Sequence, residues 1–138
     1  VYKRQAFIKD MNKLYLENDA LYYNDNDVMG FEWMDCERAE TSTVAFVRRG
    51  KTTKKQLMFI LNFTPVAHEQ YTVKAPCGGT FREILNSDAP KYGGQGRLNE
   101  SPIRAKKVTT DKKKETAYEL TCYLPPLSVV VLEYDYKK

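Results

Sequence analysis

The sequence has few of the residues on which metal sites, disulfides and nucleophilic catalysis depend. Its 138 residues include three cysteines and one histidine. Cys36, Cys77 and Cys122 are odd in number, lie far apart and form no Cys-x-x-Cys pair, so neither a disulfide framework nor a zinc site is indicated. His68 has no accompanying Ser, Cys or carboxylate motif, and we expect it to be exposed and inert. The sequence therefore predicts no metal, no cofactor and no catalytic residue.

Long hydrophobic runs are also missing. The longest, residues 57–61, is far below the roughly 20 residues that span a bilayer, so we expect no membrane association. No charged start followed by an apolar run, as in a signal peptide, stands at residue 1. Without a secretion signal, the scattered thiols favour a reducing compartment, and we expect a cytoplasmic protein.

An excess of one charge is lacking as well. The formal net charge is only +4, which does not favour a nucleic-acid partner. The single basic cluster, residues 104–114, is interrupted by no aromatic residue. We interpret it as a solvated hairpin with its tip at residues 111–114.

One segment carries a helical pattern. Within residues 4–18, the apolar side chains recur at i, i+1, i+4, i+7 and i+8, which predicts an amphipathic helix. Its expected buried stripe consists of Phe7, Ile8, Met11, Leu14 and Tyr15. The run Asn-Asp-Asn-Asp at residues 24–27 ends the pattern, because Asn and Asp favour turns. Residues 25–30 superficially resemble the start of a calcium loop, but Met29 stands at a ligand position, and we reject a calcium site.

The remainder of the sequence has the pattern of β structure. Short β-branched and aromatic segments alternate with Gly, Pro, Asn and Asp, which predicts an all-β fold: an antiparallel β-sandwich of about eight strands, preceded by the helix. The continuous apolar run at 57–61 indicates a strand covered on both faces, and the one at 127–132 indicates a central strand. Residues 118–124 alternate and should form a half-buried strand. The expected strands are 31–35, 43–49, 56–64, 70–74, 80–85, 104–109, 117–124 and 127–134.

Two aromatic residues and one loop are the candidates for ligand binding. Trp33 and Tyr92 could stack on sugar rings, but isolated aromatic side chains are more often packing residues, and both interpretations stay open. Residues 86–102 form a long segment without periodicity, of the kind that is often functional or docked on a neighbour. Its Gly93-Gly94-Gln95-Gly96 run lacks the features of a phosphate loop and is interpreted as a flexible turn.

Several short segments of the sequence resemble those of a known family. In order they are GFEWMD (30–35), FVRRG (46–50), NFTPV (62–66), FREILNSD (81–88) with YGG (92–94), and LPPL (124–127). Together they resemble the C-terminal region of bacterial-type glycogen branching enzymes, members of the α-amylase superfamily. FIKDMNKLY (7–15) resembles the last helix of that family's catalytic (β/α)₈ barrel. The resemblance covers nearly the whole chain.

The resemblance implies a division of the chain and an activity of its parent. Residues 1–24 would be the last helix of a missing barrel plus a linker, and residues 25–138 the C-terminal all-β domain; a start at Val1 rather than at methionine fits an excised piece. The parent would cleave an α-1,4-glucan with retention and transfer the segment to a 6-hydroxyl, with its catalytic carboxylates in the barrel. None of these carboxylates maps onto this chain, so we expect the chain alone to be inactive. The alternative is a stand-alone glucan-binding module that uses Trp33, Tyr92 or the loop at residues 86–102.

Overall fold

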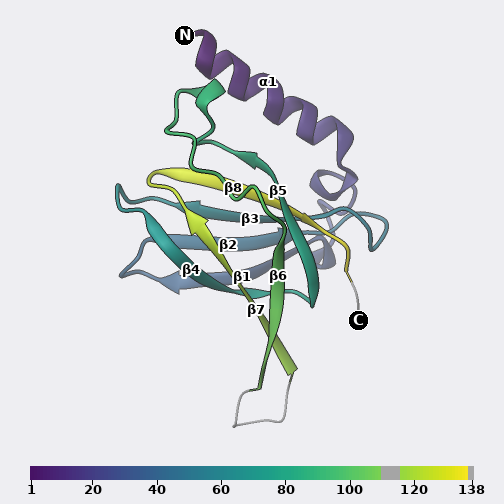
Figure 1. Cartoon of the computed structure of the whole chain (residues 1–138). Coiled ribbons are helices and arrows are strands. Elements are labelled where there is room, and N and C mark those ends of the chain that lie inside the picture. Colours follow the sequence, from purple (N-terminus) through teal and green to yellow (C-terminus); the bar gives the residue numbers. More distant parts are fainter. Residues whose placement is uncertain (110–115, 137–138) are drawn as a thin grey trace.

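The computed structural model describes residues 1–109 and 116–136. One helix, three short 3₁₀ turns and eight strands follow one another along the chain (Figure 1). They are α1 (Tyr2–Glu17), η1 (Asp19–Leu21), η2 (Val28–Gly30), β1 (Phe31–Arg38), β2 (Thr43–Arg48), β3 (Gln56–Asn62), β4 (His68–Ala75), β5 (Gly79–Asn86), η3 (Pro90–Tyr92), β6 (Ile103–Thr109), β7 (Thr116–Leu124) and β8 (Ser128–Tyr134). The helix and all eight strands were expected, and their boundaries differ from the prediction by a few residues. The expected tip at 111–114 lies outside the described residues.

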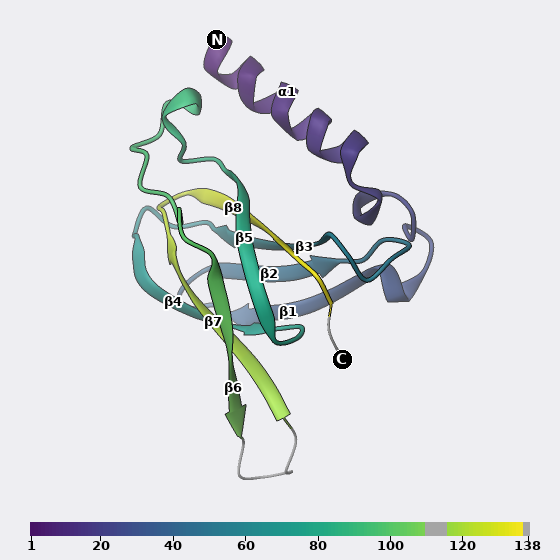
Figure 2. The same ribbon diagram turned by 45° about the vertical axis from the view of Figure 1, so that its right-hand side comes forward.

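All neighbouring strands pair antiparallel in one continuous sheet of the order β1-β2-β3-β8-β5-β6-β7-β4. The sheet folds over, so that β4, β6 and β7 cross the face of the other strands, as Figures 1 and 2 show. The edge strand β4 comes close to the opposite end of the sheet, where the Tyr71 hydroxyl lies 2.9 Å from Thr43 Oγ1. The expected sandwich is therefore a single sheet packed against itself.

The hydrophobic core fills the space between the two halves. Its largest fully buried side chains come from both halves: Phe81, Met58, Ile60, Leu132, Tyr134, Val73, Leu120 and Leu124. As expected, β8 lies in the interior of the sheet and β7 turns alternate residues into the core. β3 is also an interior strand. A second, smaller cluster on the outer face of the sheet holds Ala20, Leu57, Leu85 and Val131.

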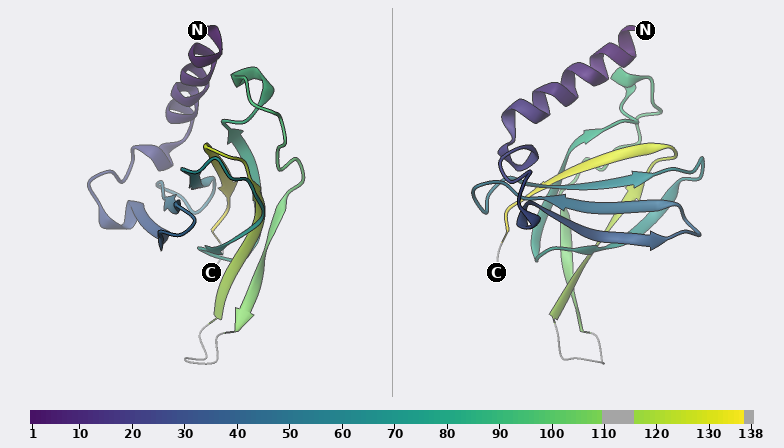
Figure 3. Two further views of the ribbon diagram at one scale, coloured as in Figure 1. Left: turned by 90° about the vertical axis from the view of Figure 1, so that its left-hand side faces the viewer. Right: turned by 180° about the vertical axis from the view of Figure 1, so that it is seen from behind.

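Helix α1 packs on this outer face, and Figure 3 shows it on one side of the sheet. Only part of the expected stripe is covered. Phe7 and Leu14 pack on the small cluster, whereas Ile8 and Tyr15 remain 50% and 47% exposed. The prediction that all five apolar residues share one buried face was wrong, because the contact line follows Phe7, Asp10 and Leu14, spaced i, i+3 and i+7.

The segment after β5 is ordered by its own backbone. The amide of Gly94 donates to Ala89 O at 3.2 Å, and that of Gly96 donates to Asp88 O at 2.9 Å. A Cβ atom on Gly94 would lie 2.0 Å from Asp88 O, so only glycine fits at this close approach. The turn expected at residues 93–96 is present, and its backbone hydrogen bonds close it into a compact loop.

His68 also departs from expectation. It is half-buried at the start of β4, and its Nε2 atom is enclosed without a hydrogen-bond partner among the described residues. A register irregularity between His68 and Tyr71 accompanies this placement, and the two rings lie 5.7 Å apart. The expectation of an exposed histidine was wrong because an irregular strand redirects side chains.

The cysteines differ strongly in environment, and this leads to a prediction. Cys36 is exposed, whereas Cys122 is buried and, as expected, belongs to the core. Burial, with a smaller contribution from the negative charge of Glu83, raises the pKa of the Cys122 thiol to about 12. Because the thiolate is the nucleophile, roughly one molecule in ten thousand would carry it at about pH 8. We expect iodoacetamide to alkylate Cys36 in the native protein and to leave Cys122 unmodified.

Peptide mapping by mass spectrometry measures this difference. Alkylation in urea is the control, since unfolding should make Cys122 as reactive as Cys36. Equal rates at the two residues in the native protein would contradict the burial of Cys122.

Candidate functional site

Tyr92, one of the two candidate residues, joins helix α1 to the β domain. Its ring packs edge-on against Phe7 with centroids 5.0 Å apart, and its hydroxyl donates to Asp10 Oδ2 at 2.5 Å. The ammonium of Lys91 lies 2.9 Å from the same oxygen of Asp10 and 5.0 Å from the centre of the Tyr92 ring. The loop between β5 and β6 is therefore held against the helix by Asp10, Lys91 and Tyr92, which we call the helix latch.

The latch shifts the pKa values of all its members. The hydrogen bond from Tyr92, followed by that from Lys91, lowers the pKa of Asp10. Burial and the neighbouring Asp10 raise the pKa of Tyr92, and Asp10 raises that of Lys91. The charged forms of Asp10 and Lys91 thus stabilise each other.

A pH dependence of helix docking follows from the lowered pKa of Asp10. A carboxylate with a lowered folded-state pKa stabilises the fold above its unfolded value, here 3.8, and loses that effect as the pH falls through the folded-state value. We expect the NMR signals of the Tyr92 ring and of α1 to stay constant down to about pH 4 and to change below it.

The variant Asp10→Asn tests the assignment of this transition. It should abolish the transition seen at the Tyr92 ring, whereas the control Asp27→Asn, in the turn before β1, should leave it in place. A transition of unchanged midpoint in Asp10→Asn would show that another group controls the docking.

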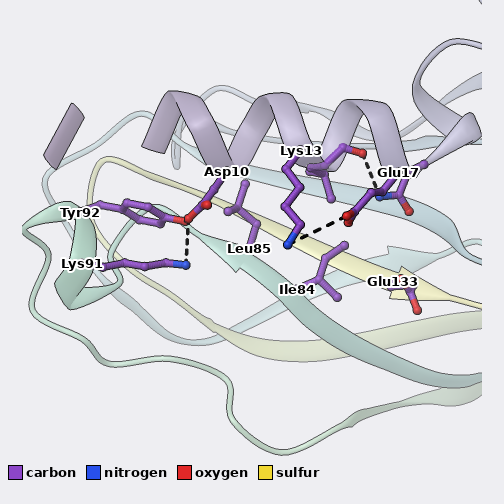
Figure 4. A pocket seen from close by; sticks show the side chains of 10 residues that line it. Asp10, Lys13, Glu17, Ile84, Leu85, Lys91, Tyr92 and Glu133 are labelled. Carbon is purple, nitrogen blue, oxygen red and sulfur yellow. Dashed lines mark hydrogen bonds and ion pairs between the residues drawn. The ribbon is translucent and has the colours of Figure 1, made fainter. Parts of the chain in front are cut away.

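Next to the latch, a groove of about 320 Å³ runs between α1 and the sheet (Figure 4). Leu14, Ile84 and Leu85 form its apolar part. The latch closes one end, and Lys13 and Glu17, 4.0 Å apart on α1, stand toward the other. The remaining lining residues are Asn18 and Glu133.

A bulge in β5 supplies the apolar part of the groove. The pairing between β5 and β8 shifts register between Glu83 and Leu85, so an extra residue is accommodated there. In a regular strand Ile84 and Leu85 would point to opposite faces, but here both line the groove. Ile84 stays 39% exposed, while Leu85 is buried.

Glu83, beside the bulge, has a structural role. Its carboxylate accepts hydrogen bonds from the side chains of Asn99 and Asn86, at 2.7 and 3.2 Å. Burial nevertheless raises its pKa. The Asn99 amide also donates to the Tyr123 carbonyl at 2.9 Å, which ties the loop between β5 and β6 to β7.

Trp33, the other candidate, lies elsewhere, on the outer face of edge strand β1. Its indole is 52% exposed and stands nearly perpendicular to the rings of Phe31 and Phe46, at 87° and 84°. The rings of Phe31, Phe46 and Phe59 stack on one another across the strands, with centroids 5.1 Å apart at each step. We call these four residues the aromatic row.

The structure does not bring Trp33 and Tyr92 together, but one line of paired residues links their surroundings. Trp33 pairs with Phe46, Phe46 with Phe59, Phe59 with Val131, and Val131 with Leu85. Neighbouring strands lie about 4.8 Å apart, so the line spans about 19 Å. Helix α1 and η1 cover its Val131 end, and the Trp33 end is uncovered.

The polar residues of the groove were not identified from the sequence. Asp10, Lys13 and Glu17 lie outside the apolar stripe that the helical period identifies, and nothing in the local pattern placed Glu133 beside them. Within residues 1–109 and 116–136, no three His, Cys, Asp or Glu side chains gather in a way that could hold a metal ion. Over the same residues, no helix combines the length and apolar character needed to cross a membrane.

Comparison with known proteins places the chain in a family. The alpha amylase C-terminal all-beta domain matches residues 33–135. Similar proteins are 1,4-alpha-glucan branching enzymes of Clostridium perfringens (37% identical over 95% of this chain), Prochlorococcus marinus (40% over 97%) and Aquifex aeolicus (38% over 95%). The chain spans only 17–20% of the length of these relatives. The eight-stranded antiparallel fold and the extent of the match show that this chain belongs to the family of alpha-amylase C-terminal all-beta domains.

Proposed function

We propose that this chain is the C-terminal β domain of a glycogen branching enzyme and has a structural role in it. The relatives at 37–40% identity carry the name 1,4-alpha-glucan branching enzyme, and nearly the whole chain matches each of them. Residues 1–24 would be the last helix of the catalytic (β/α)₈ barrel with its linker, and residues 25–138 the β domain. The parent would transfer an α-1,4-glucan segment to a 6-hydroxyl with retention, using barrel carboxylates.

The observation that carries a structural role is the apolar surface left uncovered on one side of the sheet. On α1, Ile8, Met11 and Tyr15 are 39–50% exposed, and on β1 Trp33 is 52% exposed. Exposed apolar side chains grouped on one helix face, as Ile8, Met11 and Tyr15 are, mark an interaction site in a folded protein. The barrel of the same polypeptide is the proposed partner, since α1 would belong to it and already lies on this side of the sheet (Figure 3).

A cytoplasmic location is part of the proposal. Cys36 carries an exposed thiol, and such a thiol is most stable in a reducing compartment. Glycogen synthesis in the cytoplasm would provide this setting.

A chimera tests the proposed function. The C-terminal region of the Aquifex aeolicus enzyme is replaced by this chain, and branching of amylose is followed by the number of α-1,6 linkages formed. We expect the chimera to branch amylose and the 138-residue chain alone to form no branches. Branching by the chain alone, or an inactive but folded chimera, would contradict the proposal.

A substitution in the uncovered stripe tests the role of α1. Ile8→Asp should lower the thermal stability of the chimera, because it places a charge in the proposed interface. Lys9→Asp, at an exposed neighbouring position, is the matched control and should leave the stability nearly unchanged.

The second candidate function is a glucan-binding module, and the half-exposed indole of Trp33 favours it. Affinity electrophoresis of the chain in glycogen gels separates the two. Retardation that Trp33→Ala abolishes would support binding at the aromatic row. Unchanged mobility would leave the structural role as the sole function.

A further inference from the structure

The groove between α1 and the sheet has an amphipathic lining in an ordered arrangement. Ile84 and Leu85 provide an apolar wall from the sheet, and Leu14 faces it from the helix. Polar groups stand at both ends, with the latch at one and Lys13 and Glu17 toward the other (Figure 4). From Asp10 to Glu17 the helix rises about 10 Å.

The charges of the lining nearly balance, which restricts the class of ligand. Asp10, Glu17 and Glu133 carry three negative charges, and Lys13 and Lys91 carry two positive ones. A phosphate or nucleotide would meet the carboxylates, and a cation would meet the lysines, so neither is selected. A neutral molecule rich in hydroxyl groups can use both the donors and the acceptors.

The volume of the groove and the exposure of its charged side chains restrict the class of ligand further. A volume of about 320 Å³ lies at the lower end of the range for small-molecule sites. The ion pair between Lys13 and Glu17 is loose, at 4.0 Å, with side chains 69% and 62% exposed, so both groups can turn toward a ligand at little cost. A carbohydrate of two rings fits these limits, because it presents C–H groups on its faces and hydroxyls along its edges.

We propose that the groove is a binding site for a two-residue segment of α-glucan. Ile84 and Leu14 contact the C–H face of the sugar rings. Lys13 donates hydrogen bonds to hydroxyls, and Glu17 and Glu133 accept them. Tyr92 closes one end rather than serving as a stacking platform, since Phe7 and Lys91 already occupy its surroundings. The choice of ligand rests on the proposed function, which makes glucan the substrate of the parent.

Because of the position of the groove, a bound sugar would affect the docking of α1 on the sheet. One wall is α1 and the other is β5 and β8, so a bound sugar contacts both and stabilises the docked helix. In the proposed parent, α1 is the last helix of the barrel. Glucan bound in the groove would therefore strengthen the attachment of the β domain to the barrel.

NMR titration of the 138-residue chain with maltoheptaose tests the site. We expect amide shifts to change at Lys13, Ile84 and Glu133, and not at Trp33. Lys13→Ala and Glu133→Gln should each raise the Kd about fivefold or more, because each removes or weakens a hydrogen bond to the ligand. Lys9→Ala, on the same helix but outside the groove, is the matched control and should leave the Kd unchanged.

The outcomes separate this inference from the proposed function. Absent shifts at the groove up to the highest attainable maltoheptaose concentration would overturn the site, as would shifts confined to the aromatic row. Spectra of the variants show whether they are folded. The double change Lys13→Gln with Glu17→Gln gives a second test of the Kd in which neither side chain is truncated to alanine. An active chimera without groove shifts would overturn this inference alone, whereas groove shifts with an inactive, folded chimera would overturn the proposed function alone.

Discussion

Replacement of Phe81 by alanine is expected to lower the free energy of unfolding by about 3–5 kcal/mol. Phe81 is completely buried on β5, and its ring stacks on that of Tyr134 with centroids 4.7 Å apart. Its removal leaves a cavity between the two halves of the sheet, where surrounding strands cannot close in without breaking their pairing. Since domains are typically stable by about 5–15 kcal/mol, the variant should be marginally stable.

Urea denaturation followed by circular dichroism measures the effect. Phe63→Ala is the matched control, because the same atoms are removed from a side chain that is 62% exposed. We expect the control to change stability by less than about 0.5 kcal/mol. Equal destabilisation by the two substitutions would show that Phe81 does not occupy the core.

Replacement of Asn62 by alanine should lower the free energy of unfolding by about 2–4 kcal/mol. The Asn62 side chain is 2% exposed and makes four hydrogen bonds. Its amide nitrogen donates to the carbonyls of Val66 and Pro125, at 2.8 and 2.9 Å, and its oxygen accepts from the amide and hydroxyl of Thr64, at 3.0 and 2.8 Å. Alanine leaves these buried or half-buried groups without their partner.

Because Asn62 connects the turn after β3 with the turn after β7, the effect of Asn62→Ala should be strongest in these two turns. Amide exchange in residues 63–67 and 125–128 should accelerate more than in β1 or β2. Asn26→Ala, at an exposed position of the turn before β1, serves as the control. If Asn62→Ala and Asn26→Ala had the same free energy of unfolding, the four hydrogen bonds of Asn62 would make no contribution to stability.

The strands could be predicted because their burial follows from local patterns. The apolar run at 57–61 indicates a strand covered on both faces, and in the structure Leu57 lies in the outer cluster while Met58 and Ile60 lie in the core. The alternation around Leu120 likewise specifies a half-buried strand. These signals depend only on residues near in sequence, so the fold class and the strand count could be predicted.

The candidate site could not be predicted in the same way, because contacts distant in sequence create it. The helical period identifies an apolar stripe, but Asp10 lies on the contact line because Tyr92, 82 residues away, donates a hydrogen bond to it. The bulge that turns Ile84 toward the groove has no clear signature in the sequence. Tyr92 was selected as a candidate for sugar contact, and the structure places it in the helix latch.

The position of β8 has a consequence for the order of events during synthesis. β8 lies between β3 and β5, although it follows all seven other strands in the sequence. Hairpins such as β1–β2 and β6–β7 join neighbours in sequence, but β3 and β5 have no common partner until residues 128–134 have left the ribosome. Until then β3 and β5 each expose an open strand edge that can pair with another chain. The nascent protein is thus most vulnerable to aggregation shortly before β8 emerges, and insertion of that one strand closes both edges at once.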